Sequence, residues 1–208
     1  MTRRTSKGAE RKTHSSGGRR NSRPGHSNQI RIIGGDHRGR KLSFPDLPGL
    51  RPTSDRTRET LFNWLQPVIQ GARCLDLFAG SGALGFEAAS RGASRVVMLD
   101  RAAAAVQLLK QNSELLQLGT IEVIQANALQ WLEDQPPEPF DVVFLDPPFA
   151  ERELYESCQK LQTGGWLATG AQIYVEADIS DGLPQIPAEW QQMKEKKAGQ
   201  VAFFLYTI

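Results

Sequence analysis

The chain has 208 residues, of which 39% are hydrophobic and 23% charged, and its net charge is +2. This length predicts one domain of ordinary size, with room for a short appendage. No apolar run approaches a membrane-spanning length, and the basic N-terminus has no apolar segment behind it, unlike a secretory signal. Cys74 and Cys158 are the only cysteines and lack ligand spacing, which argues against a disulfide framework or a zinc site and fits a reducing cytoplasm.

The first 28 residues carry most of the positive charge. Eight Lys and Arg side chains against Glu10 alone give this segment +7, which leaves −5 for the remainder of the chain. Large apolar side chains are almost absent, so residues 1–28 are predicted to form a disordered arm. Such a basic, Ser- and Gly-rich arm favours a polyanionic partner, and a solvated tail without a partner is the alternative.

A β-hairpin is predicted within an N-terminal extension over residues 29–50. Apolar residues at 30, 32 and 33 and at 42 and 44 flank a Gly-Gly pair, and a turn-rich link follows. Three cations lie near the tip: Arg38, Arg40 and Lys41. They are candidates for contact with a polyanion, or they only keep the hairpin soluble.

An amphipathic helix follows, for which Thr53 or Ser54 can serve as the cap. Three arginines lie at or before its first turns: Arg51, Arg56 and Arg58. The helix dipole disfavours cations there, which suggests that they serve a ligand. Salt bridges to Asp55 and Glu59 are the alternative.

The rest of the chain alternates strand and helix. Strands are expected at 73–78, 95–99, 121–125, 141–145 and 171–176, and helices at 83–91, 102–118, shortly after 127 and at 152–161. This rhythm predicts an α/β fold, a Rossmann-like parallel sheet with helices on both faces and ligands at the carboxyl ends of the strands. After a loop at 182–189, two strands at 190–197 and 201–208 predict an antiparallel hairpin that closes the sheet, as in seven-stranded methyltransferases.

The segment CLDLFAGSGALG at 74–85 is typical of a strand, a tight glycine turn and a helix that together hold a ligand. Such turns bind dinucleotides, nucleoside phosphates or S-adenosylmethionine, and the turn alone does not choose among them. Asp76 can orient the turn or meet the amino group of a cofactor. Asp100 closes the next strand, where a carboxylate can accept both ribose hydroxyls or merely cap the following helix. Asn127, beside Ala128, can read the amino edge of adenine or cap a helix.

The sequence Asp146-Pro147-Pro148-Phe149 ends a buried strand, because two prolines cannot continue a ladder. It resembles the D/N-P-P-F/Y motif of amino-group methyltransferases. Asp146 and the Pro147 carbonyl would accept hydrogen bonds from an exocyclic amine, and Phe149 would stack on an extruded base. A plain proline turn is the alternative.

Together these motifs resemble the bacterial RsmD-type methyltransferases, which modify a guanine N2 in 16S ribosomal RNA. The resemblance covers residues 30–208 and rests on IRIIGGDHRGRKL, RPTSDRTRETLFNWL, LDLFAGSGALGFEAASRGA, DPPF and the closing hairpin with KKAGQ. It implies a methyltransferase domain over 51–208, S-adenosylmethionine as donor with S-adenosylhomocysteine as product, and no metal. It also implies a monomer whose partner is 16S rRNA in the assembled or assembling small ribosomal subunit. The basic arm is not part of the pattern.

The resemblance assigns roles to three groups of residues. Catalytic roles fall to Asp146, Pro147 and Phe149. The cofactor-binding candidates are Asp76, Phe78, Gly80, Gly82, Asp100, Asn127 and Ala128. The hypothesised RNA contacts are Arg38, Arg40, Lys41, Arg51, Arg56 and Arg58.

Other functions fit parts of the same pattern. DPPF also permits a DNA adenine-N6 methyltransferase, although little length is spare for a segment that reads duplex bases. Protein glutamine methylation fits Asn better than Asp at position 146. A non-catalytic RNA-binding or assembly factor on the same scaffold is a third alternative. The choice of guanine N2 over adenine N6 rests on the resemblance alone.

Overall fold

The computed structural model describes Met1 and residues 28–47, 52–147 and 151–208. The predicted disordered arm, apart from its two end residues, falls outside these ranges, as do Arg51 and Phe149. Within them, no helix combines the length and the apolar character that crossing a membrane requires.

Seven of the described strands form one mixed sheet in the order β5-β4-β3-β6-β7-β9-β8. Their bounds are β3 Arg73–Asp76, β4 Arg95–Asp100, β5 Ile121–Gln125, β6 Phe140–Leu145, β7 Leu167–Asp178, β8 Gln191–Ala198 and β9 Val201–Thr207. The strands from β3 to β7 pair in parallel, whereas β9 runs antiparallel between β7 and β8. The predicted parallel sheet and its closing antiparallel hairpin are therefore confirmed.

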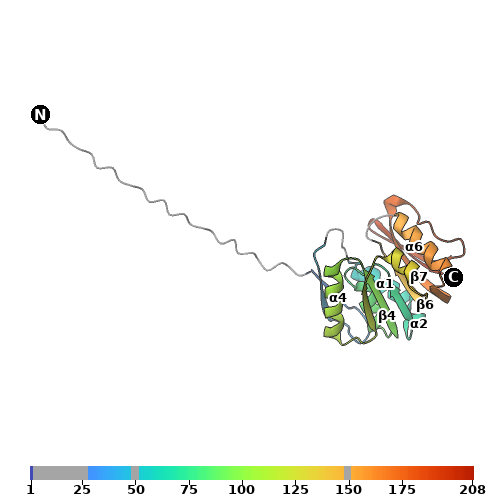
Figure 1. Cartoon of the computed structure of the whole chain (residues 1–208), viewed down its shortest axis with the longest axis horizontal. Helices are drawn as coiled ribbons and strands as arrows, with labels where there is room; N and C mark the ends of the chain where they lie inside the picture. The colour runs from blue at the N-terminus through green and yellow to red at the C-terminus, as the bar shows by residue number, and fades with distance from the viewer. Residues whose placement is uncertain (2–27, 48–51, 148–150) are drawn as a thin grey trace.

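Helices cover both faces of this sheet, as predicted (Figure 1). One face packs against α1 (Asp55–Trp64), α2 (Gln66–Ile69), α3 (Ala83–Ser90) and α4 (Ala103–Leu116), and the other against α5 (Ala128–Asp134) and α6 (Glu151–Thr163). Side chains alternate along each strand, so Phe144 of β6 faces the first layer of helices and Leu145 faces the second. This alternation divides the apolar residues into two cores.

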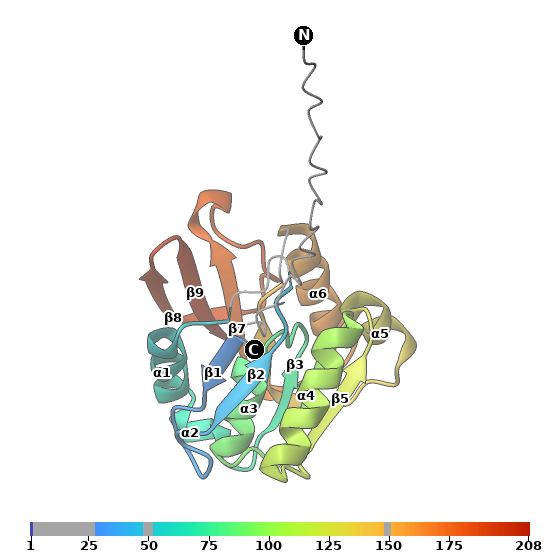
Figure 2. The ribbon, with the colours of Figure 1, turned by 90° about the vertical axis from the view of Figure 1, so that its left-hand side faces the viewer.

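The predicted N-terminal hairpin is also confirmed, as β1 (Asn28–Arg31) paired antiparallel with β2 (Lys41–Phe44). Figure 2 shows it lying over α3, between α1 and α4. Its apolar side chains Ile30 and Leu42 belong to the same buried cluster as Leu61 of α1 and Phe86 of α3. The hairpin thus completes the core on that side of the sheet instead of standing apart from it.

Several boundaries differ from those expected. Strand β3 ends at Asp76 instead of residue 78, because the chain turns there into the glycine loop. Strand β7 begins at Leu167, four residues early, since pairing of Leu167 with Phe140 overrides the weak strand pattern of a polar stretch. The short helix α2 and the 3₁₀ turn Ile179–Asp181 were not predicted.

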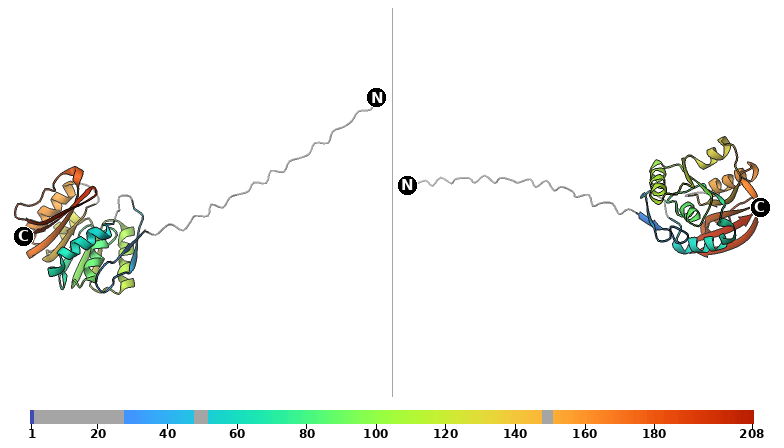
Figure 3. Two further views of the ribbon diagram at one scale, coloured as in Figure 1. Left: turned by 180° about the vertical axis from the view of Figure 1, so that it is seen from behind. Right: turned by 90° about the horizontal axis from the view of Figure 1, so that it is seen from below.

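The β8–β9 hairpin lies at the end of the sheet away from α4 (Figure 3). Strand β8 is exposed along its whole length and carries Lys194, Glu195, Lys196 and Lys197. Charged side chains on an edge strand hinder its pairing with another sheet, which keeps this edge from aggregating.

Candidate active site

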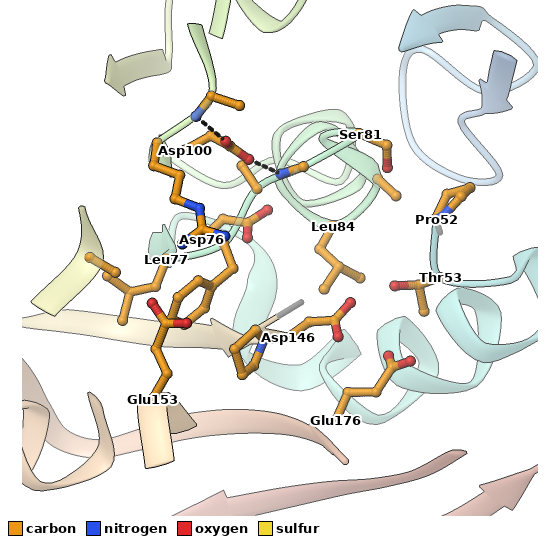
Figure 4. A pocket seen from close by; sticks show the side chains of 18 of the residues that line it. Pro52, Thr53, Asp76, Leu77, Ser81, Leu84, Asp100, Asp146, Glu153 and Glu176 are labelled. Carbon is orange, nitrogen blue, oxygen red and sulfur yellow. Dashed lines mark hydrogen bonds between the residues drawn. The ribbon is translucent and has the colours of Figure 1, made fainter. Parts of the chain in front are cut away.

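A cavity of about 420 Å³ opens at the carboxyl ends of the parallel strands (Figure 4). Its walls come from the loops after β3, β4, β5 and β6, from the end of β7 and from the residues that precede α1. The predicted site residues that line it are Asp76, Phe78, Gly80, Asp100, Asn127, Ala128, Asp146 and Pro147. This is the edge at which an open α/β sheet binds ligands.

Asp76 holds the glycine turn against the helix that follows. Its buried carboxylate accepts a hydrogen bond from the backbone N–H of Gly85, at 3.1 Å, in the first turn of α3. Burial raises the pKa of Asp76 to about 7, and the negative charge of Asp100 adds to this effect. Asp76 is therefore placed to orient the turn, one of the two roles expected of it.

The two glycines of the turn serve different purposes. Gly80 has a φ of 50° and lines the cavity. Gly82 does not line it: with a φ of 78°, it lies so close to the interior that an added Cβ would stand 2.5 Å from Phe86 and 2.6 Å from Leu109. Its requirement for glycine thus comes from packing beneath the turn, and the cofactor contact expected of Gly82 stays a prediction.

Asp100 connects the glycine turn to the end of β4. One carboxylate oxygen accepts from the Gly80 N–H at 2.9 Å, and the other accepts from the Ala102 N–H at 2.7 Å (Figure 4). The carboxylate therefore both fixes the turn and supports the start of α4. Each oxygen keeps a lone pair for a ligand, because a carboxylate offers about four acceptor positions.

Asn127 acts as the N-cap of α5, since its side-chain oxygen accepts from the Gln130 N–H at 3.1 Å. The helix cap that was the alternative for this residue is thus present in the structure. Asn127 and Ala128 nevertheless contribute to the cavity wall.

Asp146 lies directly after β6, partly buried in the cavity wall, with Pro147 beside it. Thr53 makes a side-chain hydrogen bond to the Asp146 carboxylate. Burial raises the pKa of Asp146 well above its usual range, and the charges of Glu176 and Asp76 raise it further, while the bond to Thr53 opposes the shift. A carboxyl group held this way is placed to accept a hydrogen bond from a ligand.

Two polar residues that lie beside Asp146 in the cavity were missed as site residues. Thr53 was considered only as a helix cap, but Ser54 caps α1 by accepting from the Thr57 N–H at 3.2 Å, which leaves Thr53 for Asp146. Glu176 lines the cavity from β7, and the Tyr174 hydroxyl donates to it at 2.7 Å. An acid that closes an apolar strand, as Asp100 and Asp146 do, was the available signal.

The predicted cationic contacts divide into exposed and buried side chains. Arg38, Arg40, Lys41 and Arg56 are exposed. Arg58 is only 1% exposed, forms ion pairs with Asp55 and Glu87, and so follows the salt-bridge alternative. With its guanidinium inside the protein, Arg58 has no surface to offer RNA, and this part of the prediction is wrong.

The two cysteines lie away from the cavity wall. Cys74 and Cys158 are both free and buried, as expected, and burial raises the pKa of Cys158 to about 12. Over the described ranges, no group of three or more His, Cys, Asp or Glu side chains could hold a metal ion.

The direction of β9 distinguishes this sheet from that of a dinucleotide-binding protein. A dinucleotide-binding sheet is mostly parallel and is built from two βαβαβ halves, whereas here a closing hairpin inserts β9 antiparallel between β7 and β8. This sheet, with a glycine turn after its first parallel strand and an Asp-Pro-Pro segment after β6, defines a class I methyltransferase fold.

Comparison with known proteins identifies the family. Residues 30–207 match the family model described as conserved hypothetical protein 95. The chain is 53% identical over 186 residues to ribosomal RNA small subunit methyltransferase D of Escherichia coli (strain K12), covering 88% of this chain and 93% of the relative. For the protein of the same name from Haemophilus influenzae, the identity is 44%, with 88% and 96% covered. The chain belongs to the ribosomal RNA small subunit methyltransferase D family, which confirms the predicted resemblance.

Solved structures agree with this assignment. The structure of yhhF from Escherichia coli has a TM-score of 0.81 and 50% identity, and the match covers 86% of this chain and 98% of that one. A Haemophilus influenzae structure has a TM-score of 0.74 and 43% identity over similar shares, 86% and 98%.

Proposed function

We propose that this protein transfers a methyl group from S-adenosylmethionine to the exocyclic N2 of a specific guanine in 16S rRNA of the small ribosomal subunit. The family supplies the class of substrate. The observation that carries the chemistry is that Asp146 and Pro147 share one cavity with Asp100, at the carboxyl ends of β6 and β4, the two strands that flank β3.

The cavity fits the proposed cofactor. Its volume of about 420 Å³ lies within the range of small-molecule sites. Asp100, already oriented by two backbone N–H groups, would accept the ribose hydroxyls with its remaining lone pairs. Phe78 and Gly80 would line the cofactor, and Asn127 and Ala128 would lie beside the adenine. When bound, S-adenosylmethionine supplies an electrophilic methyl group on a sulfonium and leaves as S-adenosylhomocysteine.

Asp146 would prepare the amine for attack. The lone pair of an exocyclic amine is delocalised into the ring, so the nitrogen is a poor nucleophile. Hydrogen bonds from the NH₂ group to Asp146 and to the Pro147 carbonyl would favour the pyramidal nitrogen and align it, and alignment supplies much of the acceleration. Asp146 would then take the proton or pass it to water. Phe149 would stack on the extruded base.

The exposed cations would hold the RNA backbone. Arg38, Arg40 and Lys41 on the hairpin and Arg56 on α1 are available for this role, and Arg51 stays in the proposal. Lys41 also borders a hollow that Pro52 and Thr53 share, next to the main cavity. RNA held on the hairpin would thus lie close to Asp146. We also propose that the protein acts as a monomer in the cytoplasm and that the basic arm adds to RNA affinity.

Labelled methyl transfer tests the function. The substrates are unmethylated small subunits, naked 16S rRNA and duplex DNA, with Asp146→Ala as the control. Label on a guanine of the subunit or its RNA, lost in the variant, supports the proposal. Label on DNA adenine would favour an adenine-N6 enzyme instead. Cofactor binding without transfer to any substrate would favour a non-catalytic assembly factor.

A further inference from the structure

The edges of guanine and adenine differ at one ring atom next to the amine. In guanine, N1 carries a hydrogen, so the edge presents two adjacent donors, N1–H and the N2 amine. In adenine, N1 is an acceptor beside the N6 amine. A single acid that holds an amine cannot tell these edges apart, so a second group in the site must face N1 if the site is to discriminate.

Glu176 is placed beside Asp146 by strand register. Strands β6 and β7 are parallel neighbours in which Phe144 pairs with Tyr174 and Leu145 with Val175. Asp146 therefore comes opposite Glu176 in the next register position, on strands about 4.8 Å apart. Both side chains line the cavity, and Figure 4 shows them on the same side, facing Thr53.

Among the described residues, no cation compensates the charge of these two acids, and burial raises the pKa of both, that of Asp146 further through the charge of Glu176. In the described part of the chain, no Lys or Arg lies within ion-pair distance of either one. Their protein partners are hydroxyls: Thr53 for Asp146, and Tyr174 for Glu176 at 2.7 Å. Like charges directly opposite one another on neighbouring strands are unfavourable. A ligand that brings a donor to each carboxylate would relieve this repulsion.

We propose that Glu176 accepts the N1–H of the target guanine while Asp146 accepts its N2 amine, so that the acid pair selects guanine over adenine. The inference rests on the proposed function and specifies how its substrate is recognised. An adenine in the same place would set the N1 lone pair against the Glu176 carboxylate and leave a partly buried acceptor without its partner. Sites built to bond a particular donor reject analogues that lack it far more strongly than apolar pockets reject a change in size.

The test uses 2-aminopurine, which keeps the 2-amino group but has an acceptor at N1. Small subunits are reconstituted with 16S rRNA that carries guanine or 2-aminopurine at the target position, and methyl transfer is measured as kcat/KM. The wild-type protein is expected to prefer guanine by at least about 100-fold. Glu176→Gln is expected to reduce this preference to about 10-fold or less, because an amide can accept from N1–H or donate to N1.

Glu122→Gln is the matched control, since it makes the same change on β5 at an exposed position outside the cavity wall. It should keep the wild-type preference. Equal turnover of the two substrates by the wild-type protein, or an unchanged preference in Glu176→Gln, would overturn the inference. If Glu176→Gln does not fold, Glu176→Asp takes its place, because it withdraws the carboxylate by one methylene and should also reduce the preference for guanine. Absence of methylation on the guanine substrate would instead overturn the proposed function, so the two failures are distinguishable.

Discussion

The guanidinium of Arg58 in α1 lies 3.6 Å from the carboxylate of Glu87 in α3, and both side chains are buried. Glu87 also accepts from the Ile33 N–H at 2.9 Å and from Arg91 at 2.7 Å. Arg58 in turn donates to the Arg31 carbonyl at 2.9 Å. These polar contacts join the N-terminal hairpin to α1 and α3. The hairpin, which would carry RNA contacts, is therefore fixed to α1, and the residues just before α1 line the cavity.

Arg58→Ala is expected to destabilise the protein by about 2–4 kcal/mol, because it removes one of the two described cations that pair with buried Glu87 and leaves a cavity where the Arg58 side chain was. The free energy of unfolding in urea measures this loss. Arg56→Ala is the control, since the same deletion two residues away removes an exposed side chain, and it should change the free energy by less than about 0.5 kcal/mol. Equal effects of the two substitutions would refute the structural role of Arg58.

Arg56→Ala is expected to act on RNA binding instead. Removing one phosphate contact should weaken binding and lower the slope of log affinity against log salt by about one unit. Titration of 16S rRNA at several salt concentrations gives the slope. The wild-type slope in the variant would remove Arg56 from the proposed contacts.

Asp146→Asn is expected to lower kcat by about 10²–10⁴-fold, because an amide can still accept a hydrogen bond from the amine but cannot take its proton. Affinity for S-adenosylmethionine, measured by calorimetry, should stay within a few-fold. A parallel loss of cofactor affinity would mean that Asp146 acts by shaping the cofactor site.

Asp76 should make stability depend on pH. Its pKa is about 7 in the folded protein and about 4 when unfolded, so the folded state binds more protons between these values. The contribution of Asp76 to the free energy of unfolding is therefore most favourable below pH 4 and is lost as the pH rises to 7. Above pH 7 this contribution no longer changes. The total loss of stability is on the order of 4 kcal/mol. Asp76→Asn should gain stability relative to wild type between pH 5 and 8 in urea unfolding without cofactor. Parallel stability curves for the two proteins would contradict this.

Gly82→Ala is expected to destabilise the fold by about 1–3 kcal/mol, because its φ of 78° disfavours a side chain and the added Cβ would overlap Phe86. Gly119→Ala serves as the comparison, since an added Cβ there has no atom within 4 Å. Thermal unfolding of the two variants should separate them clearly. Similar melting temperatures would show that the turn adapts to a side chain.

Local sequence patterns were enough to predict the sheet, its helices and the acids at its edge. Apolar runs that alternate with amphipathic stretches force a parallel sheet, and parallel strands bring their carboxyl ends to one edge. Asp100 and Asp146 follow such strands directly, so their place in a common cavity was predictable from chain position. The geometry of the βαβ unit alone brings these two acids to the same edge of the sheet.

Only the tertiary structure decided which other side chains reach that cavity and which leave it. The packing of α1 against the sheet and the register of β6 with β7 bring together Thr53, Asp146 and Glu176. Both relationships join segments that are distant in the sequence, so no single segment predicts them. Arg58, which its sequence context suggested as an RNA contact, turns inward because Glu87 is buried within its reach. Gly82, part of the same turn as Gly80, faces the core. Sequence patterns fix the period of a segment and the edge at which it ends, but the direction of a side chain in the fold depends on neighbours that are distant along the chain.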